Sequence, residues 1–406
     1  MLSLLGLVAS ALVGPTAEVA QAAQRPHTEF TCQAPPSSSS ARCLVRQWQD
    51  SAGRSVGPAD VPGTPLESVD IRDAYNLDGT SARGRAVAIV AARGYPDLEA
   101  DLAVYRAAQG LPACTAGGGC LRVVNQRGGT DPPPVLEGWP VEQALDVDAV
   151  SATCPDCQIV VVQADTADIA DLGRSVVTAA GMEAVVAISN SYTTRLDQSD
   201  RKYGALFHHP GIAVTAAAGD DGPGRPGYPA SSTFVTAVGG TLLLRAPATA
   251  RGWTEAAWSG TGAGCSKKNS PLQGQLSLVT ACRGRAVADV AAVADPSSGL
   301  AVFGPTESGS AWMVLGGTSL SSPIIASVYA LAGAPGDTPN ESPYLAPDNS
   351  VNDITGPPEP GCTSVLCAAG VGWDGLTGLG TPDGLGAFVA RLSDTRPDGT
   401  NEPRAR

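Results

Sequence analysis

The sequence is constrained most strongly by a regular alternation of short apolar runs with amphipathic segments, which begins near residue 65. The apolar runs are unbroken and rich in Ala, Val and Ile, as expected for strands that are buried on both faces of a parallel sheet. Helices that connect such strands cover both faces. We therefore predict an α/β fold with a mainly parallel central sheet between two helical layers. The predicted strands span residues 86–92, 121–125, 159–164, 184–190, 212–217 and 234–238, and the predicted helices 97–109, 141–153, 167–181, 197–208 and 321–332.

Composition narrows the class of protein further. The chain has 406 residues, of which 43% are hydrophobic, so it can bury a sizeable core in one large domain or two ordinary ones. Lys and Arg number 26 against 39 Asp and Glu, which leaves a formal net charge of -13. An acidic surface argues against nucleic acid or an anionic membrane as a partner. We expect a monomer.

The ten cysteines fall into pairs that are close in sequence, and local disulfides are the simplest explanation. A zinc site at Cys154 and Cys157 is the competing hypothesis, but His208 and His209 stand apart from every cysteine. Disulfides imply an oxidising, extracellular compartment. The expected pairs are Cys32 with Cys43, Cys114 with Cys120, Cys154 with Cys157, Cys265 with Cys282, and Cys362 with Cys367.

The N-terminus has the pattern of a secretory signal. Residues 2–13 form a short apolar segment, and the triplet AQA at 20–22 suits signal peptidase, which predicts a signal peptide over residues 1–22. The apolar segment is too short to span a bilayer as a helix, so we expect a secreted protein without stable membrane insertion after signal removal. The absence of Lys or Arg before Arg25 is atypical of such a signal.

The remaining boundaries follow from composition. Residues 23–64 are rich in Ser, Pro and Gly with little periodicity, so we expect a leader or surface arm there. The main domain is expected over residues 65–390, and the polar residues 391–406 are expected to form a disordered tail.

The stretch LGGTSLSSP at 315–323 has the pattern of a nucleophilic serine at a loop-to-helix junction. Its glycines allow a sharp turn and close approach of a substrate. Pro323 suits the first turn of a helix, because the N–H that it lacks would be unpaired there. Ser319 would then lie at or just before the helix start, where free amides can stabilise developing negative charge. The alternative is a hydroxyl that caps a buried helix.

A nucleophilic serine needs a proton acceptor within hydrogen-bond reach, and histidine does not supply it here. His27 lies in the leader, while His208 and His209 precede Pro210 at a predicted helix end. A Ser-His-Asp triad is therefore not indicated.

Carboxylates are the remaining candidates. Glu142 and Asp146 in GWPVEQALDVDAV are four residues apart on a predicted helix, so they lie on one side of it and can share a proton. A solvated acidic face is the alternative, but the apolar neighbours and the lack of Lys and Arg favour a functional pair. Asp220 follows an apolar strand in AVTAAAGDDGPG, where a parallel sheet places its binding loops, although an Asp that stabilises a turn is the commoner explanation.

Taken in order, these motifs resemble those of the sedolisin family, the serine-carboxyl peptidases, over roughly residues 65–389. The resemblance implies a subtilisin-like three-layer fold and a secreted serine-type endopeptidase that acts on proteins or peptides at acid pH. The matching stretches are the ExxLD helix at Glu142, SNSY at 189–192, AAGDDG around Asp220, YPASS at 228–232, AVGGT at 237–241, ADVAAVADP at 288–296, GGTSLSSP around Ser319, and GWDGLTGLGTPDG at 372–384.

Roles for four residues come with the resemblance. It makes Ser319 the nucleophile, Glu142 its general base and acid, and Asp146 the residue that orients Glu142 and shares its proton. Asp220 becomes the oxyanion donor. A carboxyl group can donate to an oxyanion only while it is protonated, and an ordinary Asp has a pKa of about 3.9, so acid pH is implied.

The resemblance also implies one bound Ca²⁺ ion. Asp353 and Asp374 would bind it through side chains, and Ile354, Gly370 and Gly372 through carbonyl oxygens, all of them hard ligands. Without the resemblance, the two aspartates in VNDITG and GVGWDG would be read as ordinary loop residues.

The chain departs from the family pattern before residue 65. Family members carry a large folded propeptide, whereas only about forty residues separate the predicted signal from the main domain, so we expect no full propeptide. Two alternatives to an endopeptidase remain: a tripeptidyl exopeptidase of the same family, and a catalytically silent sedolisin-like protein that binds peptides.

Overall fold

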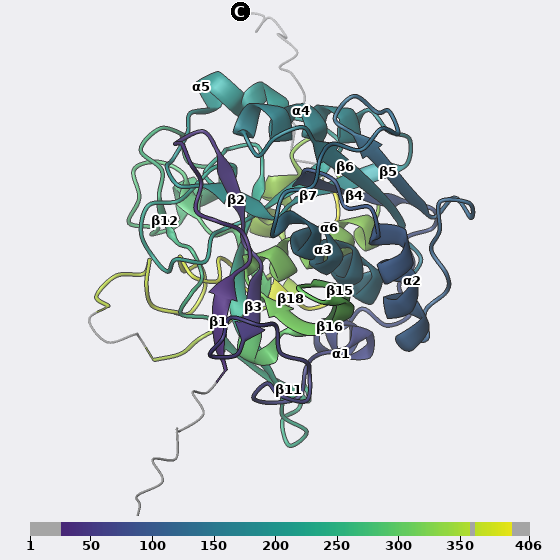
Figure 1. Cartoon of the computed structure of the whole chain (residues 1–406). Helices are drawn as coiled ribbons and strands as arrows, with labels where there is room; N and C mark the ends of the chain where they lie inside the picture. The colour runs from purple at the N-terminus through teal and green to yellow at the C-terminus, as the bar shows by residue number, and fades with distance from the viewer. Residues whose placement is uncertain (1–25, 358–361, 392–406) are drawn as a thin grey trace, which may run out of the picture.

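A computed structural model describes residues 26–357 and 362–391 (Figure 1). The predicted signal peptide and nearly all of the predicted tail lie outside these residues. The central sheet has the strand order β11-β10-β9-β7-β4-β6-β5, with β14 pairing β10. Every pairing in it is parallel except β10 with β11. Its strands are β4 (Ala86–Ala92), β5 (Leu121–Asn125), β6 (Gln158–Ala164), β7 (Val185–Asn190), β9 (Ala213–Ala217), β10 (Thr236–Arg245), β11 (Trp253–Ala257) and β14 (Val290–Val293).

Helices cover both faces of the sheet, as the alternation of the sequence predicts (Figure 1). In that view α4 and α5 lie above the strands, while α3 and α6 pack against each other below them. All seven residues of β4 are buried, which explains its unbroken apolar run. The helices are α1 (Ser68–Ala74), α2 (Leu98–Ala108), α3 (Trp139–Thr153), α4 (Ile169–Ala180), α5 (Asp200–Tyr203) and α6 (Thr318–Ala332).

Four smaller sheets complete the fold. One has the order β1-β3-β16-β15, and the others pair β2 with β8, β12 with β13, and β17 with β18. Their strands are β1 (His27–Phe30), β2 (Ala41–Cys43), β3 (Arg46–Gln49), β8 (Tyr192–Thr194), β12 (Gly264–Cys265), β13 (Ala286–Val287), β15 (Leu300–Thr306), β16 (Gly309–Gly316), β17 (Val351–Asn352) and β18 (Thr381–Pro382). The short 3-10 helices are η1 (Gly204–Leu206), η2 (Gly274–Ser277), η3 (Pro296–Ser298), η4 (Pro339–Leu345) and η5 (Asp348–Ser350).

The segment before residue 65 is the largest departure from the sequence-based expectation. Instead of a surface arm, β2 pairs with β8 and β3 pairs with β16, while β1 is added at the edge of β3, and Cys43, Leu44 and Val45 are fully buried. Its polar composition conceals this because backbone pairing with other strands, rather than a stripe of apolar side chains, holds the segment in place.

Two local predictions are also wrong. The helix expected over 197–208 is only the short α5 followed by η1, because the backbone leaves helical geometry at Tyr203, with φ of -121° and ψ of -13°. Pro323 lies inside α6 rather than in its first turn.

All five expected disulfides are present, which removes the zinc hypothesis for Cys154 and Cys157. In the part of the chain that the structure covers, no helix combines the length and apolarity needed to cross a membrane.

Candidate active site

Helix α6 presents Ser319 at the centre of the molecule. Gly317, with φ of 101°, turns the chain directly before the helix, and Ser319 is its second residue and fully buried. The Ser319 hydroxyl donates to the backbone oxygen of Ser191, 3.2 Å away. The local structure therefore matches the loop-to-helix junction predicted from LGGTSLSSP, except that Pro323 lies inside α6 and not in its first turn.

Pro323 explains one contact of the nucleophile. The carbonyl of Ser319 would ordinarily accept the N–H of residue 323, but proline has none. The hydroxyl of Ser191 lies 3.3 Å from this carbonyl oxygen and can donate to it. The proline inside α6 thus leaves a backbone acceptor next to the nucleophile for the turn between β7 and β8.

Helix α3 carries Glu142 and Asp146, and both side chains are fully buried where α3 packs on α6. Glu142 Oε2 accepts the backbone N–H groups of Leu44 and Val45, each at 2.9 Å. Asp146 Oδ1 accepts the Ser191 hydroxyl at 2.6 Å. The other carboxyl oxygen of each residue, Oε1 and Oδ2, has no hydrogen-bond partner among the described residues. A solvated acidic helix face is excluded.

Burial raises the pKa of both carboxyl groups well above their ordinary values. For Glu142 the negative charge of Asp146 is the second cause, while the Ser319 hydroxyl and the Val45 N–H oppose the rise in pKa. For Asp146 burial acts alone against the opposing hydrogen bond from Ser191. Two such groups retain at least one proton between them where isolated carboxyls would have lost both.

Asp220 lies in the loop after β9, on the other side of the start of α6. Its Oδ1 accepts the backbone N–H and the hydroxyl of Thr318, at 2.8 and 2.7 Å, whereas Oδ2 accepts no hydrogen bond in the described part of the chain. Burial raises the pKa of Asp220 to about 7, although the Thr318 hydrogen bonds and then the positive charges of Arg46 and Arg42 lower it. Below that pH the carboxyl is protonated, and Oδ2 is the oxygen free to carry and donate the proton.

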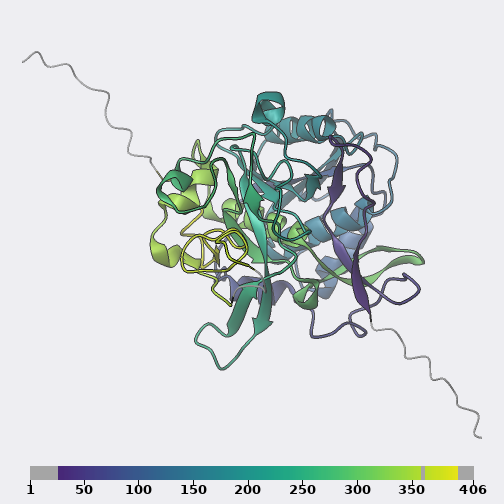
Figure 2. The same ribbon diagram turned by 90° about the vertical axis from the view of Figure 1, so that its left-hand side faces the viewer.

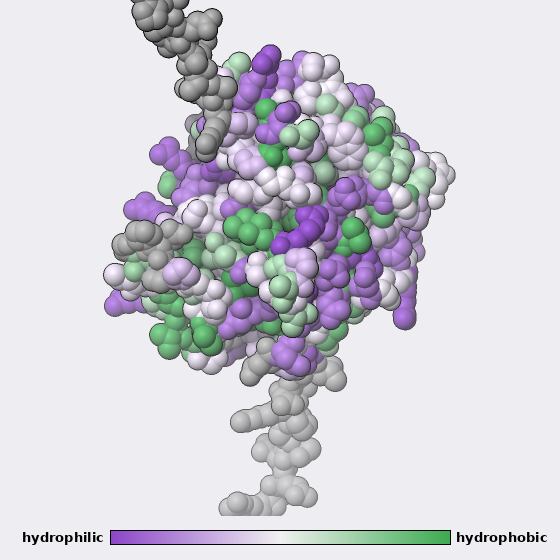
Figure 3. Space-filling model, turned by 90° about the horizontal axis from the view of Figure 1, so that it is seen from below, coloured by the Kyte–Doolittle hydropathy of each residue, from purple (hydrophilic) through white to green (hydrophobic). Residues whose placement is uncertain are grey.

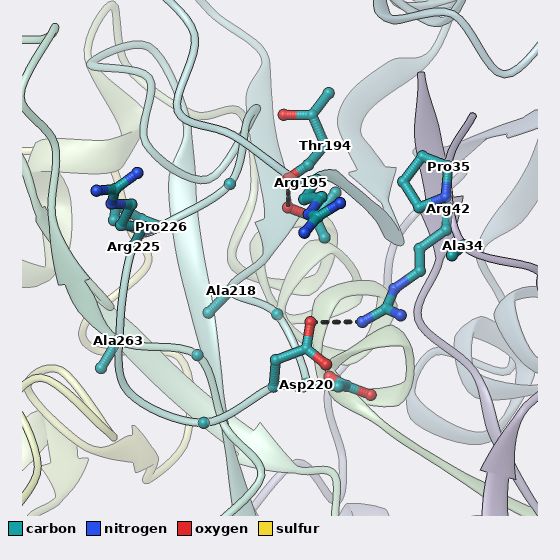
Figure 4. A pocket seen from close by; sticks show the side chains of 16 residues that line it. Ala34, Pro35, Arg42, Thr194, Arg195, Ala218, Asp220, Arg225, Pro226 and Ala263 are labelled. Atoms are coloured by element: carbon teal, nitrogen blue, oxygen red, sulfur yellow. Dashed lines mark hydrogen bonds and ion pairs between the residues drawn. The ribbon is translucent and has the colours of Figure 1, made fainter. Parts of the chain in front are cut away.

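A cavity of about 190 Å³ opens beside Asp220. Figure 4 shows Ala34, Pro35 and Arg42 on one side of it and Arg225, Pro226 and Ala263 on the other. Asp220 is the member of the candidate site that lines this cavity, so it borders a space that can hold a side chain.

The structure brings Ser319, Glu142, Asp146 and Asp220 to one place. Two further residues connect these four. The Ser191 hydroxyl donates to Asp146 and lies 3.3 Å from the Ser319 carbonyl oxygen, and Thr318, which directly precedes Ser319, donates to Asp220. The sequence reasoning missed both as site residues. Ser191 lies in the quoted SNSY motif and Thr318 directly precedes the nucleophile, so each had a recognisable signal.

The expected calcium ligands also lie close together. Asp353 Oδ2 accepts the N–H of Gly372 at 2.9 Å, and Asp374 Oδ2 accepts that of Gly370 at 3.3 Å. Carboxylate and carbonyl oxygens from these residues are the ligand types that Ca²⁺ prefers. However, the described residues contain no group of three or more His, Cys, Asp or Glu side chains suited to a metal. The backbone would have to supply most of the ligands.

Comparisons with known proteins identify relatives. No protein-family model matches the chain. It is 29% identical to kumamolisin from Bacillus sp. (strain MN-32) over 378 residues, covering 84% of this chain and 65% of kumamolisin, so it spans less than two thirds of that relative. It is 30% identical over 225 residues to tripeptidyl-peptidase 1 from Dictyostelium discoideum, covering 48% of this chain and 36% of that one.

A solved structure gives the fold independently. Pseudomonas sedolisin, described as a serine-carboxyl proteinase complexed with pseudo-iodotyrostatin, superimposes with a TM-score of 0.65 at 21% identity. The superposition covers 79% of this chain and 96% of sedolisin. The three-layer α/β fold predicted from the sequence is confirmed.

Proposed function

Because this chain belongs to the sedolisin family, we propose that it is a serine-type endopeptidase that hydrolyses protein or peptide substrates at acid pH. The observation that carries the proposal is a buried serine beside Glu142, whose carboxyl group and that of Asp146 both have raised pKa values, with a third carboxyl group, Asp220, free to donate from Oδ2. This arrangement supplies a nucleophile, a base and an oxyanion donor without histidine.

The proposed reaction starts with attack of Ser319 Oγ on the substrate carbonyl carbon, while its proton passes to Glu142. The pair with Asp146 carries one negative charge, and the two N–H donors to Glu142 Oε2 favour that charge on Glu142. The proton of Asp220 Oδ2 stabilises the oxyanion. Glu142 then returns its proton to the leaving amine, and water hydrolyses the Ser319 ester by the same route in reverse.

This mechanism requires a negative charge on the Glu142 and Asp146 pair and a proton on Asp220 at the same pH. Activity falls at low pH when Glu142 and Asp146 both hold protons, and it falls at high pH when Asp220 loses its proton near pH 7. The expected pH profile is therefore a bell centred in the acid range.

The test is hydrolysis of an unfolded protein such as reduced casein across pH 3 to 9, roughly the range in which carboxyl groups with raised pKa values titrate. We expect activity that is confined to acid pH and lost in Ser319→Ala and Glu142→Gln, with Ser327→Ala, a buried serine further along α6, as the matched control. If the Ser319→Ala variant retains the activity, the catalytic assignment is refuted. Binding without hydrolysis would support the silent peptide-binding alternative.

The tripeptidyl exopeptidase alternative draws on the similarity to tripeptidyl-peptidase 1. Mass spectrometry of the casein products separates the modes, because an endopeptidase releases internal fragments of mixed length and a tripeptidyl exopeptidase releases successive tripeptides.

Three further properties belong to the proposal. We infer secretion from the five disulfides, binding of one Ca²⁺ by Asp353, Asp374 and nearby carbonyls, and a monomeric state. The face seen from below Figure 1 intersperses hydrophilic and hydrophobic side chains (Figure 3), as is usual for the solvent-exposed surface of a monomer. Size-exclusion chromatography with light scattering tests the monomeric state.

A further inference from the structure

A second group of buried acidic side chains lies outside the candidate active site. Asp148 is fully buried and Asp101 is 5% exposed, and neither takes part in the proposed reaction. Asp148 follows Asp146 by two residues on α3, and side chains two positions apart on an α-helix point in directions about 200° apart. The side chain of Asp148 is therefore directed away from the active site, toward strand β15 and helix α2.

Strands β15 and β16 form a hairpin that packs on α3 and α2 (Figure 1). Figure 2 shows this hairpin, in green, beside the purple N-terminal strands, in agreement with the sheet order β1-β3-β16-β15. Gly304 lets β15 lie close to α3, because a Cβ there would come within 2.7 Å of the Ala144 Cβ. Strand β16 runs directly into Gly317 and Ser319, so the position of the hairpin affects that of the nucleophile.

Strand β15 is the edge strand of this sheet, so every second backbone N–H points away from β16 and needs another partner. Ala301 N donates to Leu66 O at 3.0 Å. Phe303 N donates to Asp148 Oδ2 at 3.1 Å. The next position in this series is Pro305, which has no N–H. Asp148 thus supplies the side-chain acceptor for the middle of this outer edge.

Asp101 binds the other strand of the hairpin. The Ser310 hydroxyl, on β16, donates to Asp101 Oδ2 at 2.8 Å, and the Tyr95 hydroxyl donates to the same oxygen. The ring of Tyr105, also on α2, lies with its centroid 6.1 Å from that of Trp312 on β16. Helices α2 and α3 therefore each hold the hairpin through one carboxyl group.

Asp148 has the surroundings of a protonated carboxyl group. Its Oδ1 has no hydrogen-bond partner in the described part of the chain. The N–H groups of Arg106 donate to two backbone oxygens and to the Ser151 hydroxyl, not to Asp148. Burial raises the pKa of Asp148 well above its ordinary value, and the negative charge of Asp101 adds to this. The N–H of Phe303 and then the charge of Arg106 oppose the rise in pKa.

Of the described ionisable groups near Asp148, only Arg106 is positive. The hairpin itself carries one ionisable side chain, the acidic Glu307 in its turn. On α3, Glu142 and Asp146 are acidic and lie on the opposite face. An ionised Asp148 would therefore be a buried charge without a bound partner, which is costly. The remaining neighbours are acids or phenols on α2 and in the segments before α1 and α2: Glu67, Tyr95, Asp97 and Tyr105.

We propose that the protonated carboxyl group of Asp148 fastens the edge of the β15–β16 hairpin to α3, and that loss of this proton opens the hairpin. A carboxylate accepts a stronger hydrogen bond from Phe303, but this gain is smaller than the cost of a buried charge. Water reaches Asp148 when β15 moves away from α3, so ionisation favours the open hairpin. Asp148 is thus a positioning residue for Ser319, and the inference goes beyond the proposed function.

The pH range follows from the two states of Asp148. With the hairpin open, the side chain is hydrated and has an ordinary pKa of about 3.9. With the hairpin closed, its pKa is raised. The closed form is therefore fully favoured below about pH 4. Above that, its equilibrium constant falls by up to about tenfold per pH unit until the pH reaches the raised pKa.

Hydrogen exchange measured by mass spectrometry tests the opening on the full chain with Ser319→Ala, which cannot digest itself. Peptides from the hairpin, residues 300–316, are compared with those from β4 in the core, residues 86–92. After correction for intrinsic exchange, protection of the hairpin should fall by up to about tenfold per pH unit between about pH 4 and pH 7, and should then lie below that of β4. Asp148→Asn should abolish this fall, because Asn keeps an acceptor for Phe303 and has no proton to lose.

A matched control and a second variant keep the result interpretable. Asp131→Asn removes the same charge from an exposed loop and should leave the fall unchanged. If circular dichroism shows that Asp148→Asn does not fold, Asp101→Asn replaces it. This change removes a charge that raises the pKa of Asp148, so the fall should end at lower pH and be smaller in total. A fall that persists in Asp148→Asn, or is unchanged in Asp101→Asn, overturns the inference, as does equal protection of the hairpin and β4 at about pH 7.

Casein hydrolysis by the active enzyme tests the positioning role. The rate of Asp148→Asn relative to wild type should be unchanged at about pH 4 and rise toward pH 8, as Asp148 ionises in wild type alone. The titration of Asp220 cancels in this ratio, because both proteins keep that residue. A ratio that stays constant with pH overturns the positioning role. If casein is not hydrolysed at any pH, the proposed function fails, and the exchange experiment still decides the inference.

Discussion

Replacing Asp220 with Asn separates the two protonation states of the proposed oxyanion donor. The amide has nearly the same shape as the carboxyl, and its oxygen can accept both hydrogen bonds from Thr318. Its NH₂ group then takes the place of the protonated Oδ2. Because an amide donates at every pH, we expect Asp220→Asn to retain the acid limb of the pH profile and lose the alkaline limb.

The size of the effect follows from the pKa of Asp220, which burial raises to about 7. At pH 8.5 roughly one molecule in thirty would still carry the proton, so wild-type kcat/KM should fall about 30-fold between pH 5.5 and pH 8.5. Removing an oxyanion donor outright, as in Asp220→Ala, costs about 100- to 1,000-fold in kcat. The Asn variant should lie well above the Ala variant at every pH.

The assay measures initial rates of casein hydrolysis for wild type, Asp220→Asn and Asp220→Ala from pH 3 to pH 9, where carboxyl groups with raised pKa values titrate. Thermal melts at each pH confirm that the variants are folded. If the alkaline limb of Asp220→Asn coincides with that of wild type, Asp220 is not the titrating group, and the limb belongs to the Glu142 and Asp146 pair.

The contacts of Asp220 and of the proposed calcium loop give three more predictions. Thr318→Val removes a hydroxyl that stabilises ionised Asp220, so the pKa of Asp220 should rise and the alkaline limb of casein hydrolysis should move to higher pH; a shift to lower pH would contradict this. The folded-state pKa of Asp220 lies above its unfolded value, so the folded protein binds more protons, and the free energy of unfolding of Ser319→Ala should fall as pH rises from 4 to 7. Asp220→Asn in the Ser319→Ala background should recover up to about 4 kcal/mol above pH 7 and nothing below pH 4, as measured by denaturant titration. A chelator should lower the Tm of wild type but not that of Asp353→Asn; equal Tm changes would argue against calcium at this loop.

The sheet was predictable because its strands are buried on both faces and leave an unbroken apolar signal. The burial of all seven residues of β4 and its parallel pairing agree with that signal, whereas the strand order and the register with β6 come from the structure. The helix over 197–208 was not predictable to the same extent, since α5 and η1 exchange one helical hydrogen-bonding pattern for another at Gly204. Sequence periodicity does not distinguish such a break from a continuous helix.

The candidate site divides in the same way. The sequence predicts four site residues because each lies in a recognisable motif: Glu142, Asp146, Asp220 and Ser319. The helix with Glu142 and Asp146 also lacks Lys and Arg, which indicates a functional pair rather than a solvated face. Residues 41–49, whose Leu44 and Val45 N–H groups bind Glu142, left no such signal. Their contacts are mostly backbone N–H and C=O groups, which every residue carries, so no side-chain pattern reports them.

The hydroxyl of Ser191 has a single proton and two acceptors, Asp146 Oδ1 at 2.6 Å and the Ser319 carbonyl at 3.3 Å. It can serve only one of them at a time, so it acts as a rotor with two positions. An ionised Asp146 holds the proton, and a protonated Asp146 releases it to the backbone of the nucleophile. Because Pro323 lacks the N–H that would bind the Ser319 carbonyl, this carbonyl depends on the Ser191 hydroxyl for a hydrogen bond. Its hydrogen bonding therefore responds to the charge of Asp146 on α3.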